Sequence, residues 1–215
     1  MTYNDYIIDK KNSRFIGDFE GAYKSFELIY EDQFDCSRLK FNVIRHWIQK
    51  RPKAQVLDIG AGYGCFVNEL HENSTKVLGL EISPSAIKKG KEMYGSDLPL
   101  QLADITNSFI PEKKFDIILC FGVLGHLLDK ADICLNNIDN YLSENGQIAF
   151  SIGFSPEFKL FRNILQNEVS FVNIIKKYFH VNNFIVEYLN AGTDDYDENL
   201  YKDLIVFAEK LKNVK

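Results

Sequence analysis

The sequence lacks several features that define particular classes of protein. No run approaches the roughly 18 consecutive apolar residues that a membrane-spanning helix needs. The opening stretch "MTYNDYIIDKKNSRF" has no basic end followed by an apolar segment and a small-residue cleavage site, as a secretory signal would. These absences predict a cytoplasmic protein that does not enter a membrane.

Cysteine is scarce, and positive charge is in deficit. No C-x-x-C pair that could bind zinc or cycle redox occurs among the four cysteines, Cys36, Cys65, Cys120 and Cys134, so we expect buried thiols. The chain has 25 Lys and Arg against 30 Asp and Glu, a net charge of -5. Phosphate backbones bind basic surfaces, so nucleic acid is not an expected partner.

The composition is that of a globular chain. With 215 residues, 46% of them hydrophobic, it is long enough for one domain with a full core. We expect a single domain over 1–215, with an N-terminal helical lid over 1–52 and an α/β core over 53–215. The oligomeric state stays open, with a homodimer as one option.

Strand and helix patterns alternate after an aromatic leader. Helices are predicted around 19–30 and 37–49, and the best-marked helix start is Ser83 followed by Pro84. An Asn145-Gly146 turn is expected to open one strand, a helical region should cover 156–179, and two extended segments should close the chain. Apolar strands that alternate with helices pair in parallel and need cover on both faces, so the expected fold class is α/β, doubly wound and mostly parallel.

The stretch "VLDIGAGYG" (56–64) predicts a sharp turn after a buried strand, where the backbone approaches a ligand closely. Its glycines form G-x-G-x-G and depart from the dinucleotide fingerprint G-x-G-x-x-G. A pyrophosphate would meet the negative charge of Asp58 just before the turn, whereas a cationic ligand would be attracted by it. Asp58 therefore favours S-adenosylmethionine, which carries a sulfonium and an α-amino group, over NAD.

The chain from Ala54 to Phe154 resembles the class I S-adenosylmethionine-dependent methyltransferases. Four stretches in the family's order carry the resemblance: "VLDIGAGYG", "VLGLEISPSAI", "LADI" and "FDIILCFGVLGHLLD". It implies a Rossmann-like, seven-stranded sheet with an antiparallel C-terminal strand. It also implies S-adenosyl-L-methionine as the cofactor and S-adenosyl-L-homocysteine as the product.

The resemblance assigns cofactor contacts at the strand ends. Asp58, Gly60 and Gly62 would lie by the methionine part, and Glu81 would accept hydrogen bonds from both ribose hydroxyls. Taken singly, the glycines are also explained by turn chemistry and Glu81 by a solvated strand end.

The adenine and the reacting methyl group have candidate contacts of their own. Asp104 would accept from the adenine amino group, although it could equally cap a local turn. The other assigned cofactor contacts are Ile82 and Ile105, which would cover the ring, and Phe121, at the strand end that faces the methyl group.

The chemistry needs little beyond positioning, because the sulfonium already activates the methyl group. Orientation contributes on the order of 7–11 kcal/mol, and a general base adds about 10²–10⁴-fold in rate. His126 is the candidate catalytic base and an acceptor contact, since histidine titrates near neutral pH. Capping or packing is the alternative role for His126.

The acceptor is narrowed mainly by exclusion. The segment "CFGV" does not match the Asn/Asp-Pro-Pro-aromatic tetrapeptide of enzymes that methylate adenine, cytosine or protein glutamine. No magnesium ligand set can be assembled, so no metal is predicted. The acidic stretch "TDDYDEN" (193–199) is expected to be a solvated loop.

The leader "FEGAYKSFELIYEDQFDCSRLKF" (19–41) resembles that of the nodulation N-methyltransferase, which modifies an aminosugar, although "QFDCS" replaces the family's Asp-Pro-Trp. In such enzymes the leader helices fold over the cofactor. The resemblance implies that Arg14 and Tyr23 meet the methionine carboxylate and that Tyr30 lines the acceptor cavity. An aromatic stripe packed as core is the alternative.

These observations predict a methyltransferase acting on an O or N atom of a small soluble acceptor. The favoured acceptor is a sugar or nucleotide-linked precursor of a surface polysaccharide. Two rival functions stay open, an NAD-dependent oxidoreductase and a non-catalytic S-adenosylmethionine-binding protein.

Overall fold

The computed structural model describes residues 6–9, 14–25, 39–73, 75–107, 113–127, 130–154, 167–188 and 202–211. The side chains of residues 8, 14, 15 and 188 are outside that description. Contacts within the chain define two compact units, 1–109 and 110–215. The expectation of a single domain stays a prediction.

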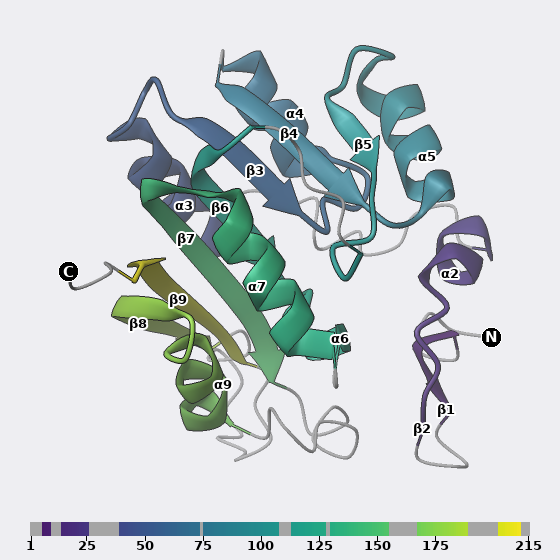
Figure 1. The fold of residues 1–215 in the computed structure, drawn as a ribbon. Coiled ribbons are helices and arrows are strands. Elements are labelled where there is room, and N and C mark those ends of the chain that lie inside the picture. Colours follow the sequence, from purple (N-terminus) through teal and green to yellow (C-terminus); the bar gives the residue numbers. More distant parts are fainter. Residues whose placement is uncertain are drawn as a thin grey trace, which may run out of the picture. The chain divides into compact units, whose positions relative to one another are not determined.

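Seven strands form the main sheet in the described part of the chain (Figure 1). They are β3 (Gln55–Ile59), β4 (Lys76–Glu81), β5 (Leu100–Leu102), β6 (Phe115–Phe121), β7 (Leu142–Phe154), β8 (Phe179–Tyr188) and β9 (Lys202–Lys210). The strand order is β5-β4-β3-β6-β7-β9-β8, and β9 runs antiparallel to both of its neighbours. The mostly parallel, doubly wound fold with an antiparallel C-terminal strand is therefore confirmed.

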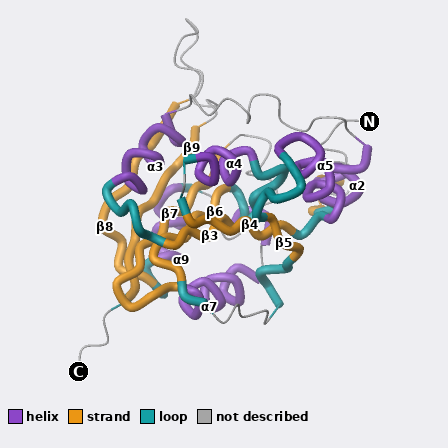
Figure 2. Tube along the Cα trace, turned by 90° about the horizontal axis from the view of Figure 1, so that it is seen from above, coloured by secondary structure: helices purple, strands orange, loops and turns teal. Residues whose placement is uncertain are grey.

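The described part of unit 1–109 contains the parallel strands β3, β4 and β5 and four helices. The helices are α2 (Phe19–Ser25), α3 (Leu39–Gln49), α4 (Cys65–Glu72) and α5 (Pro84–Tyr94). In Figure 2, α4 and α5 lie over the same face of these strands. The start of α5 is as predicted: the Ser83 side chain accepts a hydrogen bond from the backbone N–H of Ala86, and Pro84 follows.

A glycine brings α5 close to the turn after β3. A Cβ atom built on Gly90 would lie 2.1 Å from the carbonyl oxygen of Tyr63, so a larger side chain would push the helix away. Two short strands, β1 (Ile8–Asp9) and β2 (Arg14–Phe15), pair antiparallel in the same unit. The sequence analysis did not predict them, because two-residue strands are too short to show a period.

Unit 110–215 contains the other four strands and three described helices, α6 (Leu124–Leu127), α7 (Ala131–Tyr141) and α9 (Glu168–Ile175). Helix α7 covers one face of β6 and β7 (Figures 1 and 2). One face of this helix is buried, with Leu135 and Ile138 fully inside. Helix α9 occupies only part of the predicted region 156–179, and residues 155–166 lie outside the described ranges.

The predicted Asn145-Gly146 turn needs a correction. Strand β7 begins at Leu142, and its register with β6 shifts between the pairs Phe115–Leu142 and Ile117–Gln147. Asn145-Gly146 therefore lies in an irregularity inside the strand and does not open it. Strand pairing on both sides of these residues overrides their turn preference.

Two further expectations concern cysteines and membranes. Cys120 and Cys134 are buried free thiols as predicted, Cys65 is half-buried, and Cys36 lies outside the described residues. Among the helices described, none has both the length and the apolar composition needed to traverse a bilayer.

Candidate functional site

The turn after β3 is built from glycines in the left-handed region. Gly60, Gly62 and Gly64 have φ values of 74°, 58° and 79°, which other residues adopt only with strain. The backbone N–H groups of Gly60 and Ala61 both donate to the carbonyl oxygen of Leu80, at 2.8 and 3.0 Å. The turn is thus anchored to the end of β4, as a backbone that must approach a ligand closely requires.

Glu81 joins the same turn to the start of α5. Its Oε2 accepts from the backbone N–H of Gly62 at 2.8 Å, and its Oε1 accepts from those of Ile82 and Ser83, both at 2.9 Å. The residue is only 5% exposed. The alternative of a solvated strand end is therefore wrong for Glu81, because the carboxylate is buried and held by three backbone donors.

Asp58 and Glu81 are two buried acids at the carboxyl ends of neighbouring parallel strands. Burial, together with the charge of Glu81, raises the pKa of Asp58 to about 7, and Lys40 acts in the opposite direction. Burial also raises the pKa of Glu81, although three backbone hydrogen bonds act in the opposite direction. Ionising either buried carboxylate therefore costs free energy, and a cation bound beside the two acids would reduce that cost.

The end of β5 presents an acid and apolar side chains. Asp104 Oδ1 accepts from the backbone N–H and the hydroxyl of Thr106, both at 2.8 Å, and Oδ2 accepts from the Asn107 amide at 3.1 Å. The local capping role is therefore real, and it leaves the adenine role untested. Ile82 is 50% exposed, as a ring cover needs, whereas Ile105 is buried.

Leu102 is a candidate that the sequence analysis missed. It lies at the end of β5, in register with Glu81, and is 55% exposed. With Ile82 it gives an apolar surface at the ends of β4 and β5. The alternation in "LPLQL" could have identified it, but only together with the direction in which the strand faces.

The leader residues differ in what the structure describes. The Tyr23 ring packs edge-to-face on Tyr63 with centroids 5.1 Å apart, and its hydroxyl lies 3.1 Å from where a Cβ of Gly62 would stand. This places α2 beside the glycine turn. Arg14 lies in β2 with its side chain outside the description, and Tyr30 is outside the described residues.

Phe121 and His126 belong to unit 110–215 and are described within it. Phe121 ends β6 and is half-buried, and Gly122 follows with φ 72° and donates its N–H to Ser151. His126 is half-buried in α6, and its backbone N–H donates to Val123. Phe121 ends the strand as predicted, His126 follows the strand within α6, and the roles of both residues stay predictions.

The described residues offer no metal site of the usual kind. They contain no group of three or more His, Cys, Asp or Glu side chains placed to hold a metal ion. The acidic stretch 193–199 lies outside these residues, so its assignment as a solvated loop stays a prediction.

Comparison with known proteins agrees with this geometry. A family described as "Methyltransferase domain" matches residues 50–192, which is most of the chain. The chain belongs to this methyltransferase domain family. Its fold is the Rossmann-like fold of solved S-adenosylmethionine-dependent methyltransferases, as the four sequence stretches implied.

Two sequence relatives and one solved structure illustrate the range of this similarity. A tRNA U34 carboxymethyltransferase from Sulfurimonas denitrificans is 27% identical over 124 residues, 55% of this chain and 41% of that protein. Phosphoethanolamine N-methyltransferase 1 from Triticum aestivum is 30% identical over 99 residues, 43% of this chain and 20% of that protein.

The N-methyltransferase NodS from Bradyrhizobium japonicum, solved with S-adenosyl-L-homocysteine, superposes with a TM-score of 0.65 at 18% identity. The match covers 90% of this chain and 98% of that one. The chain spans less than half the length of the curated relatives it matches, so their whole activities do not transfer to it directly.

Proposed function

We propose that the chain binds S-adenosylmethionine at the ends of β3, β4 and β5 and transfers its methyl group to an O or N atom of a small acceptor. The pair of buried acids, Asp58 and Glu81, carries this proposal. They flank a turn of glycines with positive φ, and their raised pKa values favour a ligand that brings positive charge.

The residues present fit this cofactor. Glu81 Oε2 uses one lone pair on Gly62 and can accept from a ribose hydroxyl with another. Ile82 and Leu102 offer exposed apolar surface for a base, and Asp104 is an acceptor next to them. A diphosphate fits less well, because two buried carboxylates would repel it.

The protein's own part in the reaction is binding, orientation and proton transfer. When bound, S-adenosylmethionine supplies an activated methyl group on a sulfonium. Asp58 and the glycine turn would hold its amino acid part, and Glu81 would fix the ribose. His126 is proposed to accept the proton that the acceptor's O–H or N–H loses, and Tyr30 and Arg14 are proposed contacts for the acceptor and the methionine carboxylate.

For the acceptor we propose a sugar or nucleotide-linked precursor of a surface polysaccharide. The leader's resemblance to an aminosugar methyltransferase supports this choice. The net charge of -5 counts against tRNA, which a sequence relative modifies, and phosphoethanolamine is the substrate that the other relative's name gives. Cytoplasmic location, a homodimer and the absence of a metal stay expectations.

A methyl-transfer assay tests the proposal. The purified chain would be incubated with S-adenosylmethionine labelled in the methyl group and with nucleotide sugars, aminosugars, phosphoethanolamine or bulk tRNA. We expect label in a small-molecule fraction, most of it in a sugar. Label confined to tRNA would reject the small acceptor. The cofactor is tested separately by thermal unfolding, and an unfolding midpoint raised by NADH but not by S-adenosylhomocysteine would reject S-adenosylmethionine as the cofactor.

A further inference from the structure

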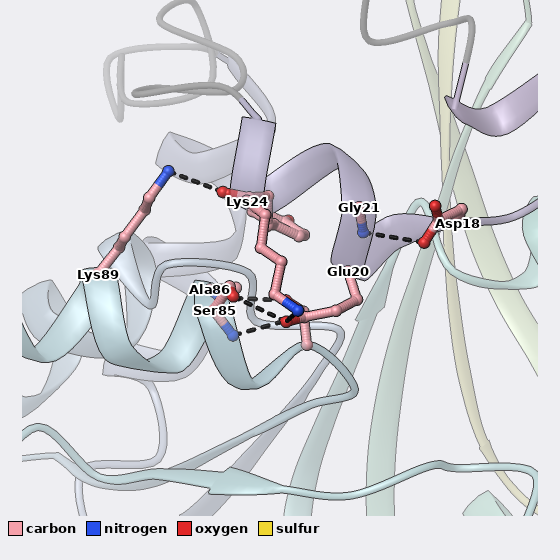
Figure 3. Close-up of polar contacts among 9 residues, drawn as sticks. Asp18, Glu20, Gly21, Lys24, Ser85, Ala86 and Lys89 are labelled. Carbon is pink, nitrogen blue, oxygen red and sulfur yellow. Dashed lines mark hydrogen bonds and ion pairs between the residues drawn. The ribbon is translucent and has the colours of Figure 1, made fainter.

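Helices α2 and α5 meet through an acid that sits on the start of α5. The carboxylate of Glu20 accepts from the Ser85 hydroxyl at 2.7 Å and from the Ser85 backbone N–H at 3.2 Å, and it also accepts from the Ser83 hydroxyl. Figure 3 shows Glu20 reaching from α2 to Ser85 in the first turn of α5. A negative charge is stabilised there by the helix dipole and its free N–H groups.

A second contact runs in the opposite direction. Lys89, one turn further along α5, donates its ammonium to the backbone carbonyl of Tyr23 at 2.7 Å (Figure 3). Tyr23 belongs to the last turn of α2, where the carbonyl groups lack partners within the helix and carry partial negative charge. Each helix therefore offers a charge to the complementary terminus of the other, and we call this pair of contacts the clasp.

The Glu20 side of the clasp is ionised at neutral pH. Burial raises the pKa of Glu20, but the hydrogen bonds from Ser83 and Ser85 outweigh it and hold the pKa at about 2. Lys24 adds a surface ion pair to Glu20 at 3.2 Å, which contributes little by itself.

Helix α2 depends on such contacts. It has seven residues, too few to be stable alone in water. Its apolar contact is small, since Ala22 is the one buried residue of the helix, packed with Tyr63 and Ala86. The same helix carries Tyr23, whose hydroxyl lies over Gly62 in the glycine turn.

We propose that Glu20 and Lys89 are positioning residues that hold α2 over the glycine turn and thereby set the affinity for the nucleoside cofactor. The identity of that ligand rests on the proposed function. Without the clasp, α2 spends less time docked, and the apparent affinity falls in proportion to the docked fraction.

Calorimetric titration with S-adenosylhomocysteine tests this role in the full chain. Its amino and carboxylate charges cancel, so its own salt dependence is small. Glu20→Gln and Lys89→Met should each weaken binding about three- to tenfold. Lys88→Met is the matched control, because Lys88 is exposed on the same helix and pairs only loosely with Glu92 at 3.9 Å; it should bind like the wild type.

Ionic strength gives a readout that a merely structural role would not move. Raising NaCl from about 50 mM to about 500 mM should weaken binding in the wild type and in Lys88→Met, and much less in Glu20→Gln. Hydrogen exchange without ligand should be faster over 19–25 in both clasp variants than in the control.

The outcomes separate the clasp from the cofactor assignment. A wild-type chain that does not bind S-adenosylhomocysteine overturns the proposed function, while hydrogen exchange over 19–25 still tests the clasp. Normal binding together with variants that match Lys88→Met overturns the clasp. If Glu20→Gln fails to fold, Lys89→Met and Ser85→Ala decide by the same measurements.

Discussion

Two acids near Ser83, Glu81 and Glu20, have pKa values shifted in opposite directions. Glu81 and Glu20 both accept hydrogen bonds near the start of α5, Glu81 from backbone N–H groups and Glu20 from serine hydroxyls and one N–H. Yet burial raises the pKa of Glu81, whereas hydrogen bonds bring that of Glu20 down to about 2. The side chain of Glu20 is one-third exposed, and Glu81 is inside.

This difference in pKa distinguishes an acid that binds a ligand from an acid that holds two helices together. Hydrogen bonds outweigh the desolvation of the partly exposed Glu20 carboxylate, but not that of the buried Glu81 carboxylate. A charge held at a cost, like those of Glu81 and Asp58, is the kind that binds a ligand. A charge that is already well satisfied, like that of Glu20, holds structure together.

The largest effect should come from removing the inner acid. Glu81→Ala leaves three backbone N–H groups without their acceptor and removes the proposed ribose contact. We expect affinity for S-adenosylhomocysteine to fall about 100-fold and the free energy of unfolding by about 2 kcal/mol. Calorimetric titration measures the affinity and urea unfolding measures the stability, in Glu81→Ala and in Glu20→Ala. Equal losses in the two variants would mean that the two acids have the same role.

Asp58→Asn should separate binding from stability. The pKa of Asp58 is raised from 3.8 to about 7, so the stability linked to its protonation is complete below pH 4 and is lost as pH rises towards 7. Relative to the wild type without ligand, the variant should gain on the order of 4 kcal/mol between pH 4 and pH 8. Its affinity for S-adenosylmethionine should be about tenfold lower at pH 8.

Urea unfolding across this pH range, with titration at its upper end, checks both expectations for Asp58→Asn. If the free energy of unfolding varied with pH in the same way in the wild type and in Asp58→Asn, then burial would not raise the pKa of Asp58.

Gly90→Ala should move α5 away from the turn that the two acids share. The new Cβ would lie 2.1 Å from the carbonyl oxygen of Tyr63, and such overpacking costs about 1–2 kcal/mol. Thermal unfolding should show this loss, with Lys88→Ala, at an exposed position of the same helix, as the control. An unchanged or higher midpoint would show that α5 is not fixed against the turn.

The smallest effect on stability should come from a serine that donates to Glu20. Ser85→Ala removes one hydroxyl from Glu20 and leaves the Ser83 hydroxyl and the Ser85 backbone N–H. We expect a loss of about 0.5–1 kcal/mol in the free energy of unfolding. A loss as large as that of Glu81→Ala, in the same urea titrations, would place Glu20 among the buried acids.

Local sequence patterns were sufficient to predict the ends of β3 and β4. The run before Asp58, the glycines after it and the Ser83-Pro84 helix start each depend on neighbours in sequence, and the structure has them where predicted. The contacts of Glu20 with Ser83 and Ser85 join residues 63 and 65 positions apart, which no periodicity reveals. The same holds for the Gly90 contact.

One wrong expectation, at Asn145-Gly146, and one rejected alternative, at Glu81, have the same physical origin. Asn145-Gly146 has the composition of a turn, but it lies inside β7 because β6 pairs with β7 on both sides of it. Glu81 could have been a solvated strand end from sequence, and only the fold shows that three N–H groups surround it. The chemistry of Asp104 is ambiguous for a further reason, since one carboxylate can cap a turn and accept from a ligand.

The decisive measurement is a crystal structure of the chain grown with S-adenosylhomocysteine. We expect density for the nucleoside with its ribose hydroxyls on Glu81 and its amino acid part along Asp58 and Gly60–Gly62. A ligand bound where both acids are out of reach would show that Asp58 and Glu81 do not form the cofactor site.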